Sequence, residues 1–185
     1  MAKIELNPVL GKNYWKWKEQ LSGTPGDLTH QEKVTVNYYG RGGIISEAKA
    51  RQFTVVSDEE KKVEGTDTAP NPLEYLLAGV GFCLASTIAI HASAFNTSFD
   101  SLEIDVSGKW SVSAYYDLVK TSPGFREINI EIRVNSSDDE SKIRKLIEIS
   151  QDHCPGINTL LNPPTINAKA IMNGSTSFVT LGHDF

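Results

Sequence analysis

Two cysteines offer the most distinctive chemistry in this sequence, and their surroundings differ. Cys154 directly precedes Pro155, which favours the first position of a helix, so Cys154 is expected at or near a helix N-cap. The free N–H groups and the helix dipole at such a position stabilise a thiolate. Cys83 lies inside the most apolar stretch of the chain, where burial raises the pKa of a thiol. From the residues alone, Cys154 is the better reactive thiol and Cys83 is more simply an inert, buried cysteine.

The histidines add little to this chemistry. His153 adjoins Cys154 and either acts on that thiol or only ends the preceding helix. His91, His153 and the two cysteines are potential zinc ligands, but no pair of them has the close spacing of a structural zinc site. His30 and His183 are isolated near the ends of the chain. Motifs for phosphate binding, dinucleotide binding, a nucleophile elbow and a zinc protease are missing, so neither a metal nor a cofactor is expected.

Composition and charge narrow the class of protein. The chain has 185 residues, of which 39% are hydrophobic and 22% charged, as is usual for a protein with a buried core. Its net charge of -5 gives no basic surface for nucleic acid or for an anionic membrane. The first residues lack the continuous apolar core of a secretory signal, so a cytoplasmic, reducing location is expected. Two cysteines in such a location are not a disulfide framework.

The residue pattern predicts an arm followed by one α+β domain. Residues 1–32 form the arm, with proline and glycine around one short, possibly helical piece. Its Trp15 and Trp17 are expected to pack on the body or on a second subunit. The domain, residues 33–185, opens with a β-meander: a strand near residues 34–36, a glycine turn at 40–43, and strands at 44–50 and 52–57.

The longest predicted helix runs from Leu73 to Phe95 and is apolar on every face. Its length permits a membrane span, but its polar and small residues and the lack of a positively charged flank favour a central buried helix. Strands with alternating apolar residues follow at 102–106 and 128–132. A second helix is predicted to start at a capping box formed by Ser137 and Glu140 and to end near His153. A short helical turn after Cys154 and a hairpin around 173–174 complete the domain.

Two strings resemble the OsmC/Ohr family. GTDTAPNPLEYLLAGVGFCLAS resembles the start of the family's central helix, where Asn-Pro leads to a glutamate and then to a cysteine. SPGFREINIEIRVNSSDDESKIRKLIEISQDHCPGINTLLNPP resembles the family's second half, with a cysteine before proline. The resemblance runs from about Val34 to the C-terminus. Glu74 lies nine residues before Cys83 rather than the ten of the peroxidase subgroups, which is more similar to the OsmC-related subgroup.

The resemblance implies an intertwined homodimer with long central helices and active sites at the dimer interface. It also implies thiol-dependent reduction of organic hydroperoxides, in which peroxide oxidises Cys83 to a sulfenic acid, Cys154 resolves it as a disulfide, and a dithiol reductant restores both. This order reverses the ranking from the residues alone. An arginine against Cys83 would make it reactive, and Glu74 would orient that arginine. Arg41 has the family's position, in the hairpin after the first strand, and Arg51 is the rival.

The sequence is therefore compatible with three functions. The first is a hydroperoxide reductase that cycles Cys83 and Cys154. The second is a dimeric module that binds a small apolar ligand, with sensing or incidental thiols. The third is a dimer whose cysteines only pack. A close pair of thiols with a basic group beside it would favour the first function, and a bound apolar molecule with no arginine near Cys83 would favour the second.

Overall fold

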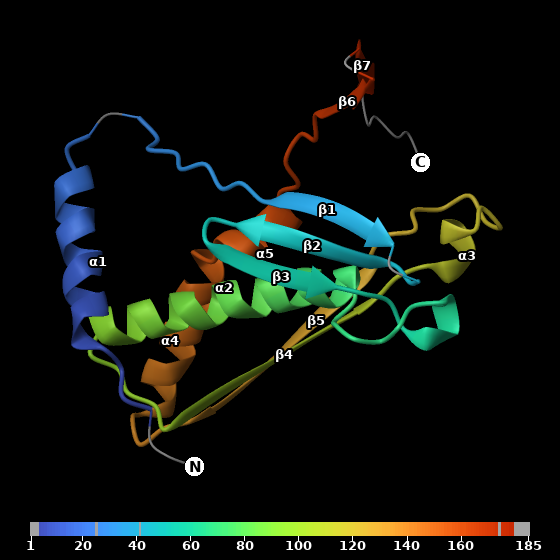
Figure 1. Cartoon of the computed structure of the whole chain (residues 1–185). Coiled ribbons are helices and arrows are strands. Elements are labelled where there is room, and N and C mark those ends of the chain that lie inside the picture. Colours follow the sequence, from blue (N-terminus) through green and yellow to red (C-terminus); the bar gives the residue numbers. More distant parts are fainter. Residues whose placement is uncertain (1–3, 25, 41, 174, 180–185) are drawn as a thin grey trace.

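The structure is a computed structural model, and it describes residues 4–24, 26–40, 42–173 and 175–179. The described chain combines helices with antiparallel strands that pair mostly with their neighbours in sequence, so the predicted α+β class is confirmed. One long helix, α2, crosses the middle of the molecule and the other elements are arranged around it (Figure 1). The predicted arm and domain boundary near residue 32 stays a prediction.

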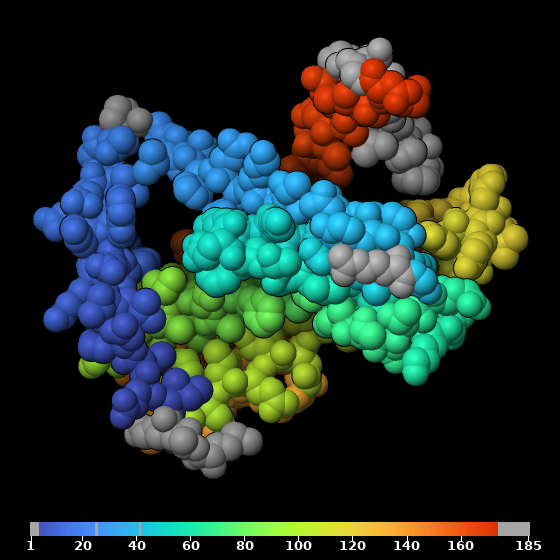
Figure 2. Space-filling model, in the orientation of Figure 1, coloured from blue at the N-terminus to red at the C-terminus, as the bar shows by residue number. Residues whose placement is uncertain are grey.

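The predicted β-meander is present. Strands β1 (Thr35–Gly40), β2 (Ile45–Ala50) and β3 (Phe53–Ser57) form an antiparallel sheet in that order. Gly40 and Gly42 have φ angles of +72° and +77°, a region that glycine adopts without steric cost. Large apolar side chains of this sheet stay exposed, although the sheet lies over part of α2 in the space-filling view (Figure 2).

Helix α2 (Pro72–Ala94) starts where the sequence predicts it. The Asn71 side chain accepts a hydrogen bond from the Glu74 N–H, and the Glu74 carboxylate accepts one from the Asn71 N–H, so the two residues form a capping box. One face of α2 is buried, but Phe82 on another face is 72% exposed. The single chain thus leaves part of this apolar helix uncovered.

The core lies between α2, a strand pair and a second helix. Strands β4 (Ser101–Lys109) and β5 (Glu127–Asn135) pair along their whole length. Their inward apolar side chains pack on the buried cluster of the core, as the alternating pattern predicts. The loop between them contains a short helix, α3 (Val112–Tyr115), that the sequence did not predict. The buried cluster consists of Leu84, Ile88, Ala92, Phe99, Leu146 and Cys154.

The predicted cap of the second helix is wrong. Helix α4 (Glu140–Asp152) has Asp139 as its N-cap, whose carboxylate accepts a hydrogen bond from the Ser141 N–H. The chain before it is tied to the turn after α2, because the Asp138 carboxylate accepts a hydrogen bond from the Ser98 N–H. The residue predicted as the cap, Ser137, lies in this tied segment, so the helix begins only after it.

The end of α4 and the start of α5 (Pro155–Leu161) match the prediction. His153 is the C-cap of α4 and Cys154 is the N-cap of α5. Strands β6 (Ala168–Met172) and β7 (Ser175–Val179) then pair as the predicted hairpin.

Helix α1 (Pro8–Leu21) packs across the C-terminal end of α2 (Figure 1). The Gly11 N–H donates to Ser93 Oγ at 2.9 Å, and Trp15 Nε1 donates to the Ala94 carbonyl at 2.9 Å. Trp15 thus packs on the body, as expected, whereas Trp17 is 57% exposed.

By length and composition, α2 could cross a membrane, and it is the one such helix among the described residues. The core helix of a protein without a membrane meets the same criterion. In this chain α2 packs against α1, β4, α4 and α5. Its apolar character is therefore weak support for a membrane span.

Candidate thiol site

The structure brings the two cysteines together. Cys83 lies near the middle of α2, and Cys154 lies at the start of α5, which packs on α2. Cys83 packs against the buried cluster that contains Cys154, and the Cys154 thiol is near enough to raise the pKa of Cys83. The Gly156 N–H, in the first turn of α5, donates a hydrogen bond to Cys83 Sγ at 3.3 Å. Both thiols and one backbone donor therefore meet where α5 contacts α2.

The two thiols differ in exposure. Cys154 is 0% exposed and belongs to the buried core cluster. Cys83 is only partly buried, and its neighbours Phe82, Gly79 and Ser86 on α2 are exposed. Cys83 therefore lies at the border between the buried and the exposed faces of α2.

The surroundings of Cys83 favour the protonated thiol. Burial raises the pKa of Cys83, the Gly156 N–H lowers it, and the Cys154 thiol raises it again. Among the described residues, no cation contributes to this pKa. A positive charge has to be added beside Cys83 before much thiolate forms near neutral pH.

Gly156 is a site residue that the sequence analysis missed. A Cβ atom at this position would lie 3.1 Å from Cys83 Cβ and 3.4 Å from Cys83 Sγ. The absence of a side chain lets α5 approach close enough for its N–H to reach the sulfur. The available signal was a glycine in the first turn of a helix, next to a Cys-Pro pair, where no turn requires it.

Of the charged residues predicted for the site, neither Glu74 nor Arg51 lies beside the thiols in the part of the chain that the structure describes. Glu74 lies nine residues before Cys83, which places it about 13.5 Å away along the helix axis, and its carboxylate is used in the capping box. Arg51 lies in the turn between β2 and β3 with φ +55°, and its guanidinium stacks 5.1 Å from the centre of the Phe53 ring. Arg41 lies outside the described residues. The choice between the two arginines stays a prediction.

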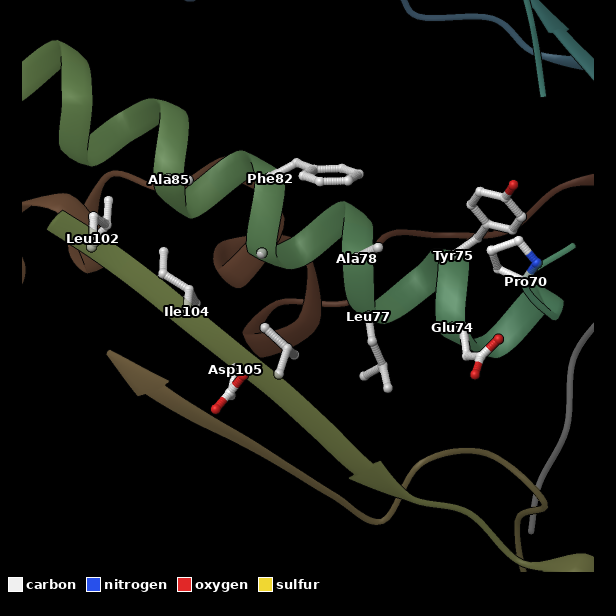
Figure 3. A pocket seen from close by; sticks show the side chains of 12 residues that line it. Pro70, Glu74, Tyr75, Leu77, Ala78, Phe82, Ala85, Leu102, Ile104 and Asp105 are labelled. Carbon is white, nitrogen blue, oxygen red and sulfur yellow. The ribbon is translucent and has the colours of Figure 1, made fainter. Parts of the chain in front are cut away.

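A groove of about 700 Å³ runs between α2 and β4. Leu77, Leu102 and Ile104 point into it, with Glu74 at one end (Figure 3). Its lining includes Gly81 of α2, and Cys83, two residues later, is rotated by about 200° around the helix. The groove therefore lies on a different side of α2 from the thiol pair.

A buried histidine lies between α2 and α4, on the α2 face that carries Cys83. His91 Nδ1 is 3.0 Å from the buried Ser150 Oγ. The rings of Tyr14, Phe95 and His153 surround the imidazole of His91. Burial, and then the charge of His153, lower the pKa of His91. The neutral imidazole thus joins the two elements that lead to Cys83 and Cys154.

The other histidines are placed more simply. His153 Nδ1 is 2.9 Å from the Ile149 carbonyl, a contact that fits its role in ending α4. His30 is exposed next to Glu32, and His183 lies outside the described residues. No group of three or more metal-binding side chains occurs among the residues that the structure describes.

The sequence pattern of the family described as "OsmC-like protein" matches residues 65–169 of this chain. The chain belongs to the OsmC-like family. Cys83, Cys154, Glu74 and Gly156 lie inside the matched residues, whereas Arg41 and Arg51 lie outside them. The family thus covers the thiol pair and the elements that hold it.

Relatives and solved structures agree with this membership. A protein named hydroperoxide reductase from Mycoplasma genitalium is 30% identical over 112 residues, 59% of this chain and 72% of that protein. The crystal structure of an OsmC-like protein from Mycoplasma pneumoniae has a TM-score of 0.64 and 25% identity, over 74% of this chain and 91% of that chain. An organic hydroperoxide resistance protein OsmC from Legionella pneumophila shares the fold, with a TM-score of 0.53 and 14% identity, over 72% and 93% of the two chains.

Proposed function

We propose that this OsmC-like protein reduces organic hydroperoxides through Cys83 and Cys154. The observation that carries the proposal is the packing of Cys83 against the buried cluster that contains Cys154, with the Gly156 N–H beside the sulfur of Cys83. The names of the mycoplasma relatives support a role in peroxide detoxification. The proposal includes a cytoplasmic location, because dithiols are available there to reduce the enzyme again.

The cycle has three steps. The Cys83 thiolate attacks one peroxide oxygen, the O–O bond breaks, and the organic part leaves as an alcohol after taking up a proton. Cys83 is now a sulfenic acid. The Cys154 thiolate attacks its sulfur and expels the oxygen as water, which leaves a Cys83–Cys154 disulfide. A dithiol then reduces the disulfide and becomes oxidised itself.

Exposure supports this assignment of roles. A peroxide can reach only a sulfur with an open side, and Cys83 is partly exposed whereas Cys154 is fully enclosed. Cys154 can meet the oxidised sulfur of Cys83 without entering solvent. The roles implied by the family resemblance therefore fit the burial of the two thiols better than the ranking from the residues alone.

A homodimer is part of the proposal. Burial raises the pKa of Cys83, so the thiolate needs a cation, and Arg41 or Arg51 of either subunit is the candidate. The exposed Phe82 beside Cys83 and the exposed apolar side chains of the β1–β3 sheet offer surface for a second copy. Dimer formation would cover this surface and bring further charged groups towards α2.

The test is consumption of tert-butyl hydroperoxide in the presence of a dithiol. Cys83→Ser is expected to abolish peroxide consumption, because it removes the sulfur that peroxide attacks. When the dithiol is left out, Cys154→Ser is expected to consume about one equivalent and to keep Cys83 as a sulfenic acid, because the chain has no second thiol to resolve it. Wild type is expected to turn over many times when the dithiol is present.

Equal inactivity of all three proteins would exclude the peroxidase function.

The apolar groove between α2 and β4 favours a binding module as the second candidate. In that case a fluorescent apolar probe should bind stoichiometrically, and Ala78→Trp in the groove should weaken its binding while Cys83→Ser leaves it unchanged.

A further inference from the structure

We propose that the reducing thiol attacks the disulfide at Cys83, so that Cys154 is the leaving group and the mixed disulfide forms on Cys83. This inference deepens the proposed function, since it requires the Cys83–Cys154 disulfide. Either sulfur of a disulfide can be attacked in principle, and access decides between them. Burial in this fold differs sharply between the two sulfurs.

Cys154 is enclosed by its own chain. It is fully buried in the core cluster with Leu84 and Leu146, and Gly156 and the rest of α5 pack next to it on α2. A second subunit can add atoms to this surrounding but cannot remove any. The enclosure of Cys154 therefore holds for the monomer and for any assembly of intact chains.

Cys83 has an open side. Gly79 precedes it by one helical turn on α2, and a Cβ atom added at Gly79 would meet nothing within 4 Å. In a helix, side chains lean towards the N-terminus, so the sulfur of Cys83 lies over the turn that contains Gly79. The proposed function requires this side of Cys83 to stay open to peroxide in the dimer as well, and a small thiol can then use the same route.

The direction of attack leads to the same choice. A thiolate approaches a disulfide sulfur roughly in line with the S–S bond, from the side opposite the leaving sulfur. For attack on Cys83 this line runs outward from the core, because Cys154 lies on the core side. For attack on Cys154 the line would pass through the buried side chains around it.

Reduction of the disulfide takes two exchange steps, and each of them conserves atoms and electrons. The first thiolate of the dithiol bonds to Cys83 Sγ, the S–S bond breaks, and Cys154 leaves with the electron pair and takes up a proton. The second thiol of the reductant then attacks the reductant sulfur that is bonded to Cys83. Cys83 is released as a thiolate and the reductant leaves as a cyclic disulfide. A monothiol lacks the second sulfur, so the mixed disulfide on Cys83 persists long enough to trap.

The experiment traps this intermediate in the full chain. The disulfide is formed in parallel with tert-butyl hydroperoxide and with diamide, so that it is available even if the peroxide is not a substrate. Cysteamine is added briefly, acid stops the exchange, and free thiols are alkylated before the peptides are analysed by mass spectrometry. Cysteamine is expected on Cys83 and the alkyl group on Cys154. The reverse pattern, or no disulfide with either oxidant, would overturn the inference.

Single-cysteine variants provide a second measurement in the folded state. Cys154→Ser keeps only Cys83, and Cys83→Ser keeps only Cys154. The remaining thiol in Cys154→Ser is expected to react with a small aromatic disulfide at least about tenfold faster than that in Cys83→Ser, because access limits the exchange. Equal rates in proteins of unchanged circular dichroism would contradict the inference. A disulfide that forms with diamide but not with peroxide would instead count against the proposed function alone.

Discussion

At the scale of single residues, Gly156 controls how closely α5 approaches Cys83. Its N–H reaches Cys83 Sγ only because no side chain separates them. Gly156→Ala places a methyl group 3.1 Å from Cys83 Cβ, so α5 has to shift outward. The resulting crowding is expected to cost about 1–3 kcal/mol of folding free energy and to move the N–H away from the sulfur.

Formation of the Cys83–Cys154 disulfide should therefore be slower in Gly156→Ala than in wild type. The rate is measured after one equivalent of oxidant, together with thermal unfolding. Gly23→Ala is the control, because a Cβ at Gly23 meets nothing within 4 Å. An unchanged disulfide rate in Gly156→Ala would show that this close approach does not matter for the thiol pair.

A second residue-scale prediction concerns pH. Burial holds the pKa of His91 below its ordinary value of 6.5, so the unfolded chain takes up this proton at a higher pH than the folded chain does. The contribution of His91 to stability is therefore complete above about pH 6.5 and is lost as the pH falls through the folded pKa. The melting temperature of wild type should therefore fall between pH 7 and pH 5.

His91→Phe keeps an aromatic ring among Tyr14, Phe95 and His153 but cannot take up a proton. The melting temperature of this variant at pH 7 should fall, because Ser150 loses its partner. Its further decrease between pH 7 and pH 5 should be smaller than that of wild type. Parallel decreases in the two proteins would assign the pH effect to other groups.

At the scale of elements, α1 depends on a close contact with the end of α2. A Cβ at Gly11 would lie 2.4 Å from the Ser93 carbonyl oxygen, so the two helices meet backbone to backbone. Gly11→Val is expected to separate α1 from α2 at a cost of about 1–3 kcal/mol. The Trp15 indole would then lose its hydrogen bond to the Ala94 carbonyl and become hydrated.

This separation is measured by a red shift of tryptophan fluorescence and by faster proteolysis within the first residues. Gly23→Val is the matched control, because a side chain at Gly23 enters open space. Fluorescence identical to wild type in Gly11→Val would mean that α1 is held in place by other contacts.

At the scale of the whole molecule, the uncovered side of α2 predicts a dimer. Phe82 is a large apolar residue at 72% exposure beside the partly buried Cys83, in a protein whose sheet β1–β3 also exposes apolar side chains. Light scattering after size-exclusion chromatography without detergent is expected to give twice the 20.3 kDa of one chain. Phe82→Glu should shift this mass towards that of the monomer, because it would bury a charge.

Leu28→Glu serves as the control, since Leu28 is also strongly exposed but precedes the matched family residues. A monomeric wild type would remove the second subunit as the source of the cation near Cys83. Retention of the dimer in Phe82→Glu would place the interface elsewhere on the chain.

Local pattern determined most of the elements of this protein. The alternating apolar residues of β4 and β5, the Asn-Pro start of α2 and the Cys-Pro start of α5 each act within a few residues, so the sequence was sufficient to predict them. The cap of α4 was predicted at the wrong residue because a distant turn, through Ser98, holds the segment before it. The short helix α3 was not predicted because its four residues are too few to show a periodic pattern.

The sequence by itself singled out Cys83 and Cys154 as the residues for thiol chemistry, since residue type and family resemblance are both properties of the chain. Their meeting, the enclosure of Cys154, the open side of Cys83 and the role of Gly156 were decided only by the tertiary structure. Contact and exposure depend on how α5 packs against α2, and that packing joins segments far apart in the sequence. The burial of a thiol, and with it its pKa and its access to reagents, follows from this packing rather than from its neighbours along the chain.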